Sequence, residues 1–234
     1  DPLLAKYKVE PARLGGIQPG TSRPEDTNAE WGEPTKVIQN DGVEQRLYTV
    51  EPFEQVVTTV ENGVVASIVV NLNQAFSPGD VASQLALSEF RPVVVRDGTG
   101  RPLGQAYPER GVLFGFDPEA EEPAVVQIIL EPIDAQTFIA RAENQQIAQP
   151  QSSLNDLEVA AHLAPEEVKT YALQASILYH VGLTEEAMAA AKKAIELKPD
   201  EPAALLTRAK IAMELDDYEL AAEDLQKTLK LAGQ

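Results

Sequence analysis

The 234-residue sequence contains no cysteine, which excludes disulfides, thiolate metal ligands and a cysteine nucleophile together. Histidine is scarce as well, with only His162 and His180, and aromatic residues make up 6% of the chain. No hydrophobic run approaches the roughly 18 residues that a membrane-spanning helix needs. We therefore expect no membrane span. Because the sequence starts at Asp1 and not at Met, a leader or anchor upstream of Asp1 remains an open alternative.

Basic residues are few, and 19 of them stand against 37 acidic ones, a formal charge of −18. Phosphate backbones are bound by clustered Lys and Arg, so this balance excludes nucleic acid as the expected partner. The charge is spread over the chain, with 11 basic and 22 acidic residues in 1–145 and 8 and 15 in 146–234. It therefore describes a soluble surface and not a polyacidic tail.

Motifs for catalysis are also missing. The sequence has no G-x-S-x-G elbow, H-E-x-x-H helix or Walker loop, and the glycine-rich stretch 98–104 lacks a lysine and is interrupted by Pro102. The two histidines fall on different predicted helices. The acidic stretches 119–122 and 216–217 lack the alternating oxygen ligands around a glycine that a calcium loop needs. We predict a non-enzymatic protein with no catalytic residue, no metal site and no cofactor.

Glycine and proline are distributed unevenly between the two ends of the chain. Residues 1–145 hold 12 Gly and 13 Pro, whereas residues 146–234 hold 2 and 4. This predicts an α+β fold class in which a sheet-containing N-terminal domain, residues 1–143, is followed by an all-α region, residues 153–234. The polar, amide-rich segment 144–152 is interpreted as a linker.

The helical region repeats with a period of 34 residues. Shifting the sequence by this distance aligns Ala175 with Ala209 and Ala187 with Ala221. Small residues at such positions allow two antiparallel helices to approach closely. The spacing predicts a lone helix followed by two helical hairpins.

This pattern resembles the tetratricopeptide repeat (TPR), whose helix-turn-helix unit has 34 residues. The positions that carry the resemblance are Tyr171, Ala175, Leu178, Gly182, Ala187, Ala194 and Pro199 in one repeat, and Leu205, Ala209, Tyr218, Ala221 and Leu231 in the next. Gln174 and Arg208 depart from it, because the family usually has leucine at their position. We expect these two residues to weaken the packing.

The resemblance implies a concave face, lined by the first helix of each repeat, that binds a peptide or protein partner. On the family's geometry this face carries Lys169, Ala172, Ser176, Tyr179, His180, Leu206, Lys210 and Met213. Two alternatives remain open: the helices pack on the N-terminal domain, or they form a homo-oligomer with another copy of the chain.

The N-terminal domain reads as two units of the same order, residues 17–72 and 76–133. In the first, a polar helix with Ser22 as N-cap precedes strands near 45–50, 54–60 and 64–72, and Asn62-Gly63 marks a hairpin. In the second, Ile128 and Leu130 correspond to Ile68 and Val70. We predict a duplicated helix plus three-stranded antiparallel meander, giving about six strands with the helices on one face.

The segments Gly20-Thr21-Ser22, Trp31-Gly32-Glu33-Pro34 and Leu47-Tyr48, followed by the Asn62-Gly63 hairpin, resemble the BamE outer-membrane lipoprotein family. Their order is also similar to the repeated unit of β-lactamase inhibitor protein. The resemblance implies a periplasmic or otherwise extracytoplasmic scaffold that contacts other proteins, with a cytoplasmic location as the alternative. It also raises a second hypothesis, an inhibitor that occludes an enzyme's active site with N-terminal domain loops, here the acidic residues 119–122.

Overall fold

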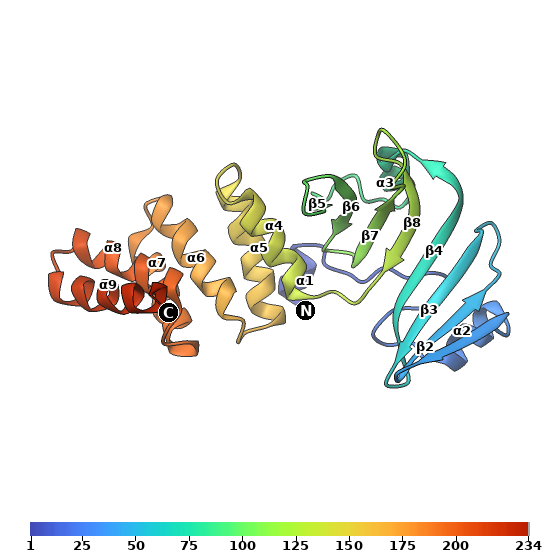
Figure 1. Cartoon of the computed structure of the whole chain (residues 1–234), viewed down its shortest axis with the longest axis horizontal. Helices are drawn as coiled ribbons and strands as arrows, with labels where there is room; N and C mark the ends of the chain where they lie inside the picture. The colour runs from blue at the N-terminus through green and yellow to red at the C-terminus, as the bar shows by residue number, and fades with distance from the viewer. Residues whose placement is uncertain (234) are drawn as a thin grey trace. The chain divides into compact units, whose positions relative to one another are not determined.

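The computed structural model of the chain describes residues 1–233 and divides into two units, residues 1–134 and 135–234 (Figure 1). The helices are α1 (Pro2–Lys6), α2 (Pro24–Trp31), α3 (Pro78–Gln84), α4 (Ala135–Gln145), α5 (Pro150–Leu163), α6 (Val168–His180), α7 (Thr184–Leu197), α8 (Pro202–Glu214) and α9 (Tyr218–Ala232). The strands are β1 (Lys36–Asn40), β2 (Val43–Tyr48), β3 (Gln55–Glu61), β4 (Val64–Phe76), β5 (Val93–Arg96), β6 (Pro102–Tyr107), β7 (Val112–Phe116) and β8 (Val125–Leu130).

Unit 1 is built on one antiparallel sheet of eight strands in the order β1-β2-β3-β4-β8-β7-β6-β5. Helix α2 precedes the first four strands and α3 precedes the last four, so the predicted duplication and the α+β class are confirmed. Each meander has four strands and not the predicted three. The sequence-based prediction omitted β1, which is short and polar, and β5, which has only four residues.

The two halves of unit 1 meet at the centre of the sheet, where β4 pairs with β8. Ile68 lies opposite Leu130, and Val70 lies opposite Ile128. Since the sequence comparison equates Ile68 with Ile128 and Val70 with Leu130, the two pairs are reciprocal. The halves are therefore related by a local twofold arrangement about the β4–β8 junction.

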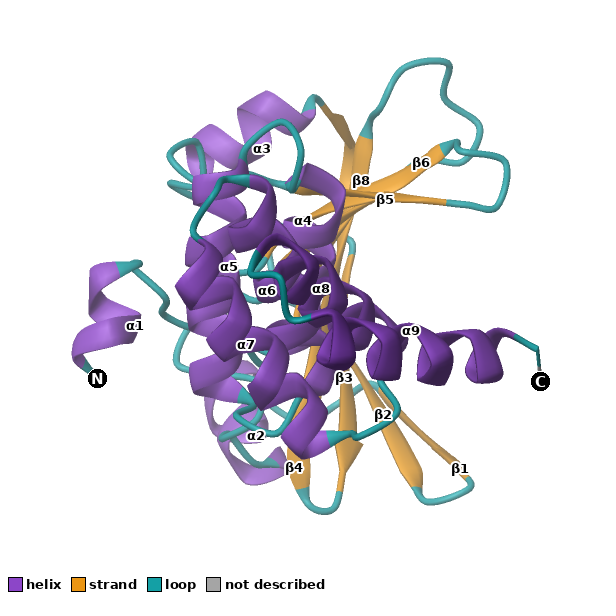
Figure 2. Cartoon of the chain, turned by 90° about the vertical axis from the view of Figure 1, so that its left-hand side faces the viewer, coloured by secondary structure: helices purple, strands orange, loops and turns teal. Residues whose placement is uncertain are grey.

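One face of the sheet forms the core of unit 1. Figure 2 shows α2 and α3 on the same side of the strands, as predicted. The buried cluster on this face consists of Ile17, Tyr48, Val56, Val65, Ile68, Val70, Val81, Ala82, Leu87, Tyr107, Val112, Phe114, Val125 and Leu130. Trp31 packs against it with its ring edge-on to Tyr48, at a centroid distance of 5.3 Å. Trp31 is therefore a packing residue of the helix–sheet interface, as the sequence suggested.

The opposite face of the sheet carries an apolar row. Successive paired residues from β2 to β5 are Leu47, Val57, Val69, Ile129, Leu113, Ala106 and Val93. All of them except the buried Val93 are partly exposed. A chain with a charge of −18 thus has an uncharged row across seven strands of its sheet.

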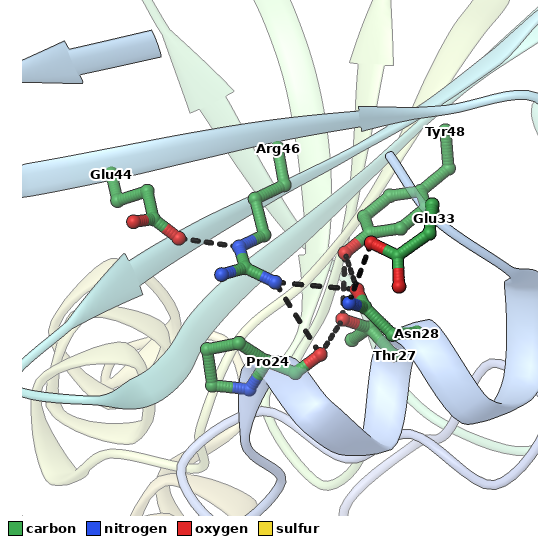
Figure 3. Close-up of polar contacts among 7 residues, drawn as sticks. All are labelled: Pro24, Thr27, Asn28, Glu33, Glu44, Arg46 and Tyr48. Carbon is green, nitrogen blue, oxygen red and sulfur yellow. Dashed lines mark hydrogen bonds and ion pairs between the residues drawn. The ribbon is translucent and has the colours of Figure 1, made fainter. Parts of the chain in front are cut away.

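A polar network joins α2 to β2 (Figure 3). The Tyr48 hydroxyl lies 2.7 Å from Thr27 Oγ1, and it donates to Asn28 Oδ1 over 3.2 Å. The Arg46 guanidinium donates to the same Asn28 oxygen over 3.2 Å and forms an ion pair with Glu44. Ser22 is not the N-cap as predicted; its hydroxyl accepts from the backbone of Gln18, and α2 begins after Arg23.

Unit 2 consists of three helical hairpins, α4–α5, α6–α7 and α8–α9 (Figure 1). Their second helices begin at residues 150, 184 and 218, which are 34 residues apart. The expected lone helix, α5, therefore has a partner, α4. The boundary between units lies at 134/135 and not at 143, and residues 144–152 are not a linker because α4 ends at Gln145 and α5 begins at Pro150.

The helical spacing of four apolar residues explains this correction. Ala135, Phe138, Ile139 and Ala142 are buried on one face of α4. The amides that follow them gave the segment its linker-like composition. Packing of an apolar face outweighed that local composition, as it does for most helices in folded proteins.

Two ion pairs occupy the same place in the first and third hairpins. Arg141 contacts Asp156 over 2.9 and 2.6 Å, and Arg208 contacts Asp224 over 2.7 Å at both nitrogens. The hydrogen bond to Asp224 raises the pKa of the Arg208 guanidinium. The expectation that Arg208 weakens packing is therefore wrong, since its planar group is matched by a buried carboxylate.

Candidate functional site

The predicted binding residues all lie on α6 and α8, the first helices of the second and third hairpins, and these two helices contact each other. Helix α6 begins after Glu167, whose carboxylate accepts from the Lys169 backbone N–H over 3.2 Å. Helix α8 begins with Pro202, whose missing N–H costs nothing in the first turn. Both helices are thus fixed at their N-terminal ends.

A polar cluster joins the C-terminal halves of α6 and α8. The Tyr179 hydroxyl donates to Glu214 Oε1 over 2.7 Å, and the Lys210 ammonium lies 5.9 Å from the centre of the Tyr179 ring. The hydrogen bond to Glu214 raises the pKa of the Tyr179 phenol. The His180 ring stands edge-on to Tyr179 at 5.9 Å. We name Tyr179, His180, Lys210 and Glu214 the α6–α8 cluster.

Neither Ser176 nor His180 is arranged for catalysis in this cluster. His180 Nδ1 lies 2.6 Å from the backbone oxygen of Ser176, which is the internal contact of a helix C-terminus. In the described part of the chain, no group of three or more His, Asp or Glu side chains is placed to hold a metal ion. Within residues 1–233, no helix has both the length and the apolarity needed to cross a bilayer.

Two of the predicted binding residues have other roles. Ala172 is only 4% exposed and belongs to a buried cluster with Ala194 and Ala204, so it is not a surface residue of the groove. Its small side chain lets α8 pack against the α6–α7 hairpin. Lys169 is exposed and forms an ion pair with Glu143 of α4 over 2.7 Å. The sequence analysis missed Glu143, because it assigned that residue to the end of the N-terminal domain.

The remaining predicted residues provide apolar surface. Leu206 is 38% exposed and Met213 is 52% exposed, both on α8. Together with the α6–α8 cluster they form a surface of mixed character, in which aromatic, apolar and charged groups lie close to one another. Such a combination can bind a peptide through side-chain packing and charge-assisted hydrogen bonds.

Residues 168–201 match the family model of the tetratricopeptide repeat. The match spans α6, α7 and the turn before α8, and it supports the resemblance found in the sequence. The α4–α5 and α8–α9 hairpins have the same helix order and spacing as this TPR. No curated protein matches the chain in sequence.

Several solved structures are similar to unit 2. The type III secretion translocator chaperone SycD of Yersinia enterocolitica is 13% identical over 43% of this chain and 76% of its own, with a TM-score of 0.40. MamA of Desulfovibrio magneticus RS-1 is 23% identical over 42% of this chain and 55% of its own, with a TM-score of 0.38. The second TPR of Spaghetti, solved with an HSP90 peptide bound, is 17% identical over 42% of this chain and 92% of its own, with a TM-score of 0.40.

Proposed function

We propose that this protein is a non-enzymatic scaffold that binds a peptide or protein partner through the surface of α6 and α8. The observation that carries the proposal is the α6–α8 cluster beside exposed Leu206 and Met213. Tyr179 offers an aromatic ring held by one hydrogen bond, and Lys210 offers a charge whose nearest aromatic contact is that ring. Aromatic side chains flanked by charge are enriched among the residues that dominate binding energy.

The partner segment that fits this surface carries both apolar and acidic groups. An acidic side chain of the partner would meet Lys210, and an apolar one would contact Leu206 or Met213. Because Lys210 and Glu214 bracket Tyr179, a partner carboxylate placed at Lys210 also keeps its distance from Glu214. This complementarity gives orientation more than raw affinity.

Paired variants in an affinity-capture experiment test the proposal. The chain is immobilised and exposed to extract from its source organism, and bound proteins are compared between wild type and Tyr179→Ala/Lys210→Ala. We expect a partner to be retained by wild type and lost from the double variant. Ile147→Ala, which changes an equally accessible apolar residue between α4 and α5, serves as the control. Equal capture by all three forms would refute the assignment of the surface.

A second candidate function uses the loop 117–124 of unit 1. Its backbone is held by a hydrogen bond from Arg101 to the Pro118 carbonyl and by the Asp117 carboxylate, which accepts from Glu119 N–H over 2.8 Å. Glu119, Glu121 and Glu122 are exposed at its tip. An ordered acidic loop of this kind suits an inhibitor that enters a basic active site. Deleting residues 119–122 should then abolish inhibition of the captured enzyme while the helices of unit 2 remain folded.

We also propose that the protein works outside the cytoplasm, on the basis of the resemblance of its N-terminal sequence to BamE. Fractionation of source cells followed by immunodetection tests this location. Recovery in the cytoplasmic fraction alone would exclude it and would remove the basis for that resemblance.

A further inference from the structure

The outer side of the last hairpin exposes residues whose counterparts are buried inside the array. Ile139 of α4 is 1% exposed, and Ala172, at the same place in α6, is 4% exposed. Leu206 has the same place in α8 and is 38% exposed. Each of the first two hairpins is followed by another, whereas none follows the third within the described residues. A side-chain position that is covered twice is therefore uncovered at α8.

Helix α9 shows the same change with a larger apolar area. Leu157 of α5 and Ala191 of α7 are fully buried, while their counterpart Leu225 is partly exposed. One turn further, Leu229 is 72% exposed, and its counterpart Ile195 packs against a buried cluster. Tyr218, Ala222, Leu225 and Leu229 follow one another at intervals of four, three and four residues, so they form one stripe along α9.

Contacts inside the array indicate what this surface accommodates. Tyr179 of α6 contacts Glu214 and Lys210 of the next hairpin, and Met213 has the place of Tyr179 one repeat later. We name the surface of Leu206, Met213, Tyr218, Ala222, Leu225 and Leu229 the terminal face. Its position in the repeat is one that receives a helix in each earlier hairpin, so a helix is the element whose shape fits it.

The charges beside the stripe indicate which helix fits. Helix α9 has Asp217 and Glu219 at its start and Lys227 and Lys230 near its end. Glu219 and Lys230 are eleven residues apart and lie on the same side of the helix, next to the stripe. Within the described residues, neither forms an ion pair with another side chain. An antiparallel helix of the same sequence would place Glu219 opposite Lys230 twice, whereas a parallel one would place like charges together.

We propose that the terminal face binds a second copy of this chain, with the two α9 helices antiparallel about a twofold axis near Leu225. The interface is isologous, so the same residues contribute from both copies. Its apolar part joins Tyr218 of each copy to Leu229 of the other, and its rim joins Glu219 to Lys230. Helix α9 is about 22 Å long at 1.5 Å per residue, so the contact is small and its dimer is expected to dissociate on dilution.

Sedimentation velocity of the full chain over about a hundredfold concentration range tests this proposal, because the dimer fraction follows mass action. Wild type should pass from monomer to dimer with rising concentration. Leu229→Glu should remain monomeric with an unchanged helical circular dichroism spectrum. Ile147→Glu changes a residue that is 93% exposed elsewhere in unit 2 and should behave like wild type. A wild type that is monomeric throughout, or an equal loss of association in both variants, would overturn the proposal.

A charge exchange tests the orientation of the two helices. Lys230→Glu and Glu219→Lys should each weaken association about tenfold, because each variant places two like-charge pairs in the rim. The double variant Glu219→Lys/Lys230→Glu restores opposite charges across an antiparallel interface and should dimerise like wild type. A double variant that associates more weakly than either single variant would exclude the antiparallel arrangement.

Discussion

At the residue scale, the hairpins of unit 2 fill one packing position in two different ways. The first and third hairpins use an arginine–aspartate pair, and the second uses Gln174 and Ala190 at the corresponding places. Asp224 is buried, so its charge depends on Arg208 for compensation. A buried pair of this kind is costly to break by removing one member and often neutral to replace as a whole.

The chain supplies its own replacement for this pair. Arg208→Gln alone should lower the free energy of unfolding by about 3 kcal/mol, since it leaves the buried Asp224 carboxylate without its partner. Arg208→Gln/Asp224→Ala introduces the residues of the second hairpin and should recover most of that loss. Urea unfolding followed by circular dichroism gives both values. A double variant no more stable than the single one would show that the pair is not the source of the loss.

Tyr48 and Tyr107 are buried at corresponding positions of the two halves of unit 1, but their hydroxyl groups have different partners. Tyr48 contacts Thr27 and Asn28, and Tyr107 accepts from the Gln105 amide over 2.6 Å. Tyr48→Phe should cost about 1–3 kcal/mol of stability because it leaves buried polar groups of α2 unpaired. Tyr107→Phe should cost less, because Gln105 is partly exposed and can turn toward water. Thermal unfolding of the two variants in parallel measures the difference.

Tyr179 gives the α6–α8 cluster a dependence on pH. The hydrogen bond to Glu214 raises the pKa of its phenol above the unfolded value. This contribution to stability is therefore fully present below the unfolded pKa, and it is lost as the pH rises through the folded pKa. Absorbance titration of tyrosinate, as the difference between wild type and Tyr179→Phe, isolates this group. Glu214→Gln should move its titration to lower pH; an unchanged curve would contradict the stated cause.

At the element scale, close approach of β6 and β7 depends on a glycine. A Cβ added at Gly104 would lie 2.1 Å from the Phe114 carbonyl oxygen, a backbone atom that cannot turn aside. Gly104→Ala should therefore separate the two strands and destabilise unit 1 by more than the roughly 1 kcal/mol of an ordinary glycine effect. Gly79→Ala is the matched control, since no atom lies within 4 Å of its added Cβ and alanine favours helix α3. Denaturant midpoints of the two variants should move in opposite directions.

Turn chemistry and periodicity made some elements predictable and left others undetected. Asn62-Gly63 predicted the β3–β4 hairpin, and both residues have the positive φ angles, 52° and 76°, of a tight hairpin turn. Strands β1 and β5 were missed, because their pairing comes from neighbouring strands and not from an alternating apolar pattern. Helix α4 was missed because its polar end resembles a linker. In each case, tertiary contacts supplied what the local sequence lacked.

The candidate site was predictable as a surface but not in its contacts. The 34-residue period placed the chosen residues on α6 and α8, and the structure brings Tyr179, His180 and Lys210 together there. The burial of Ala172 and the pairing of Lys169 with Glu143 required knowledge of how α4 and α8 pack against α6. A repeat period gives positions along the array, whereas exposure depends on which neighbour follows.

At the scale of the whole molecule, the chain has two separate cores, one in the sheet of unit 1 and one along the hairpins of unit 2. Fragments 1–134 and 135–234 should therefore each fold when produced alone. Circular dichroism should show a sheet spectrum for the first and a helical spectrum for the second, each with a cooperative thermal transition. A fragment without such a transition would show that its core needs the other unit.

The reciprocal pairing of β4 and β8 has a consequence for the ancestry of unit 1. Each half contributes one helix, four strands and the same central edge, so the complete sheet is what two identical half-length chains would make by joining those edges. On this view the segment between β4 and β8 is a later covalent tether. Fusion of two gene copies would have turned an association that depended on concentration into one that is always formed, and the two halves were then free to diverge.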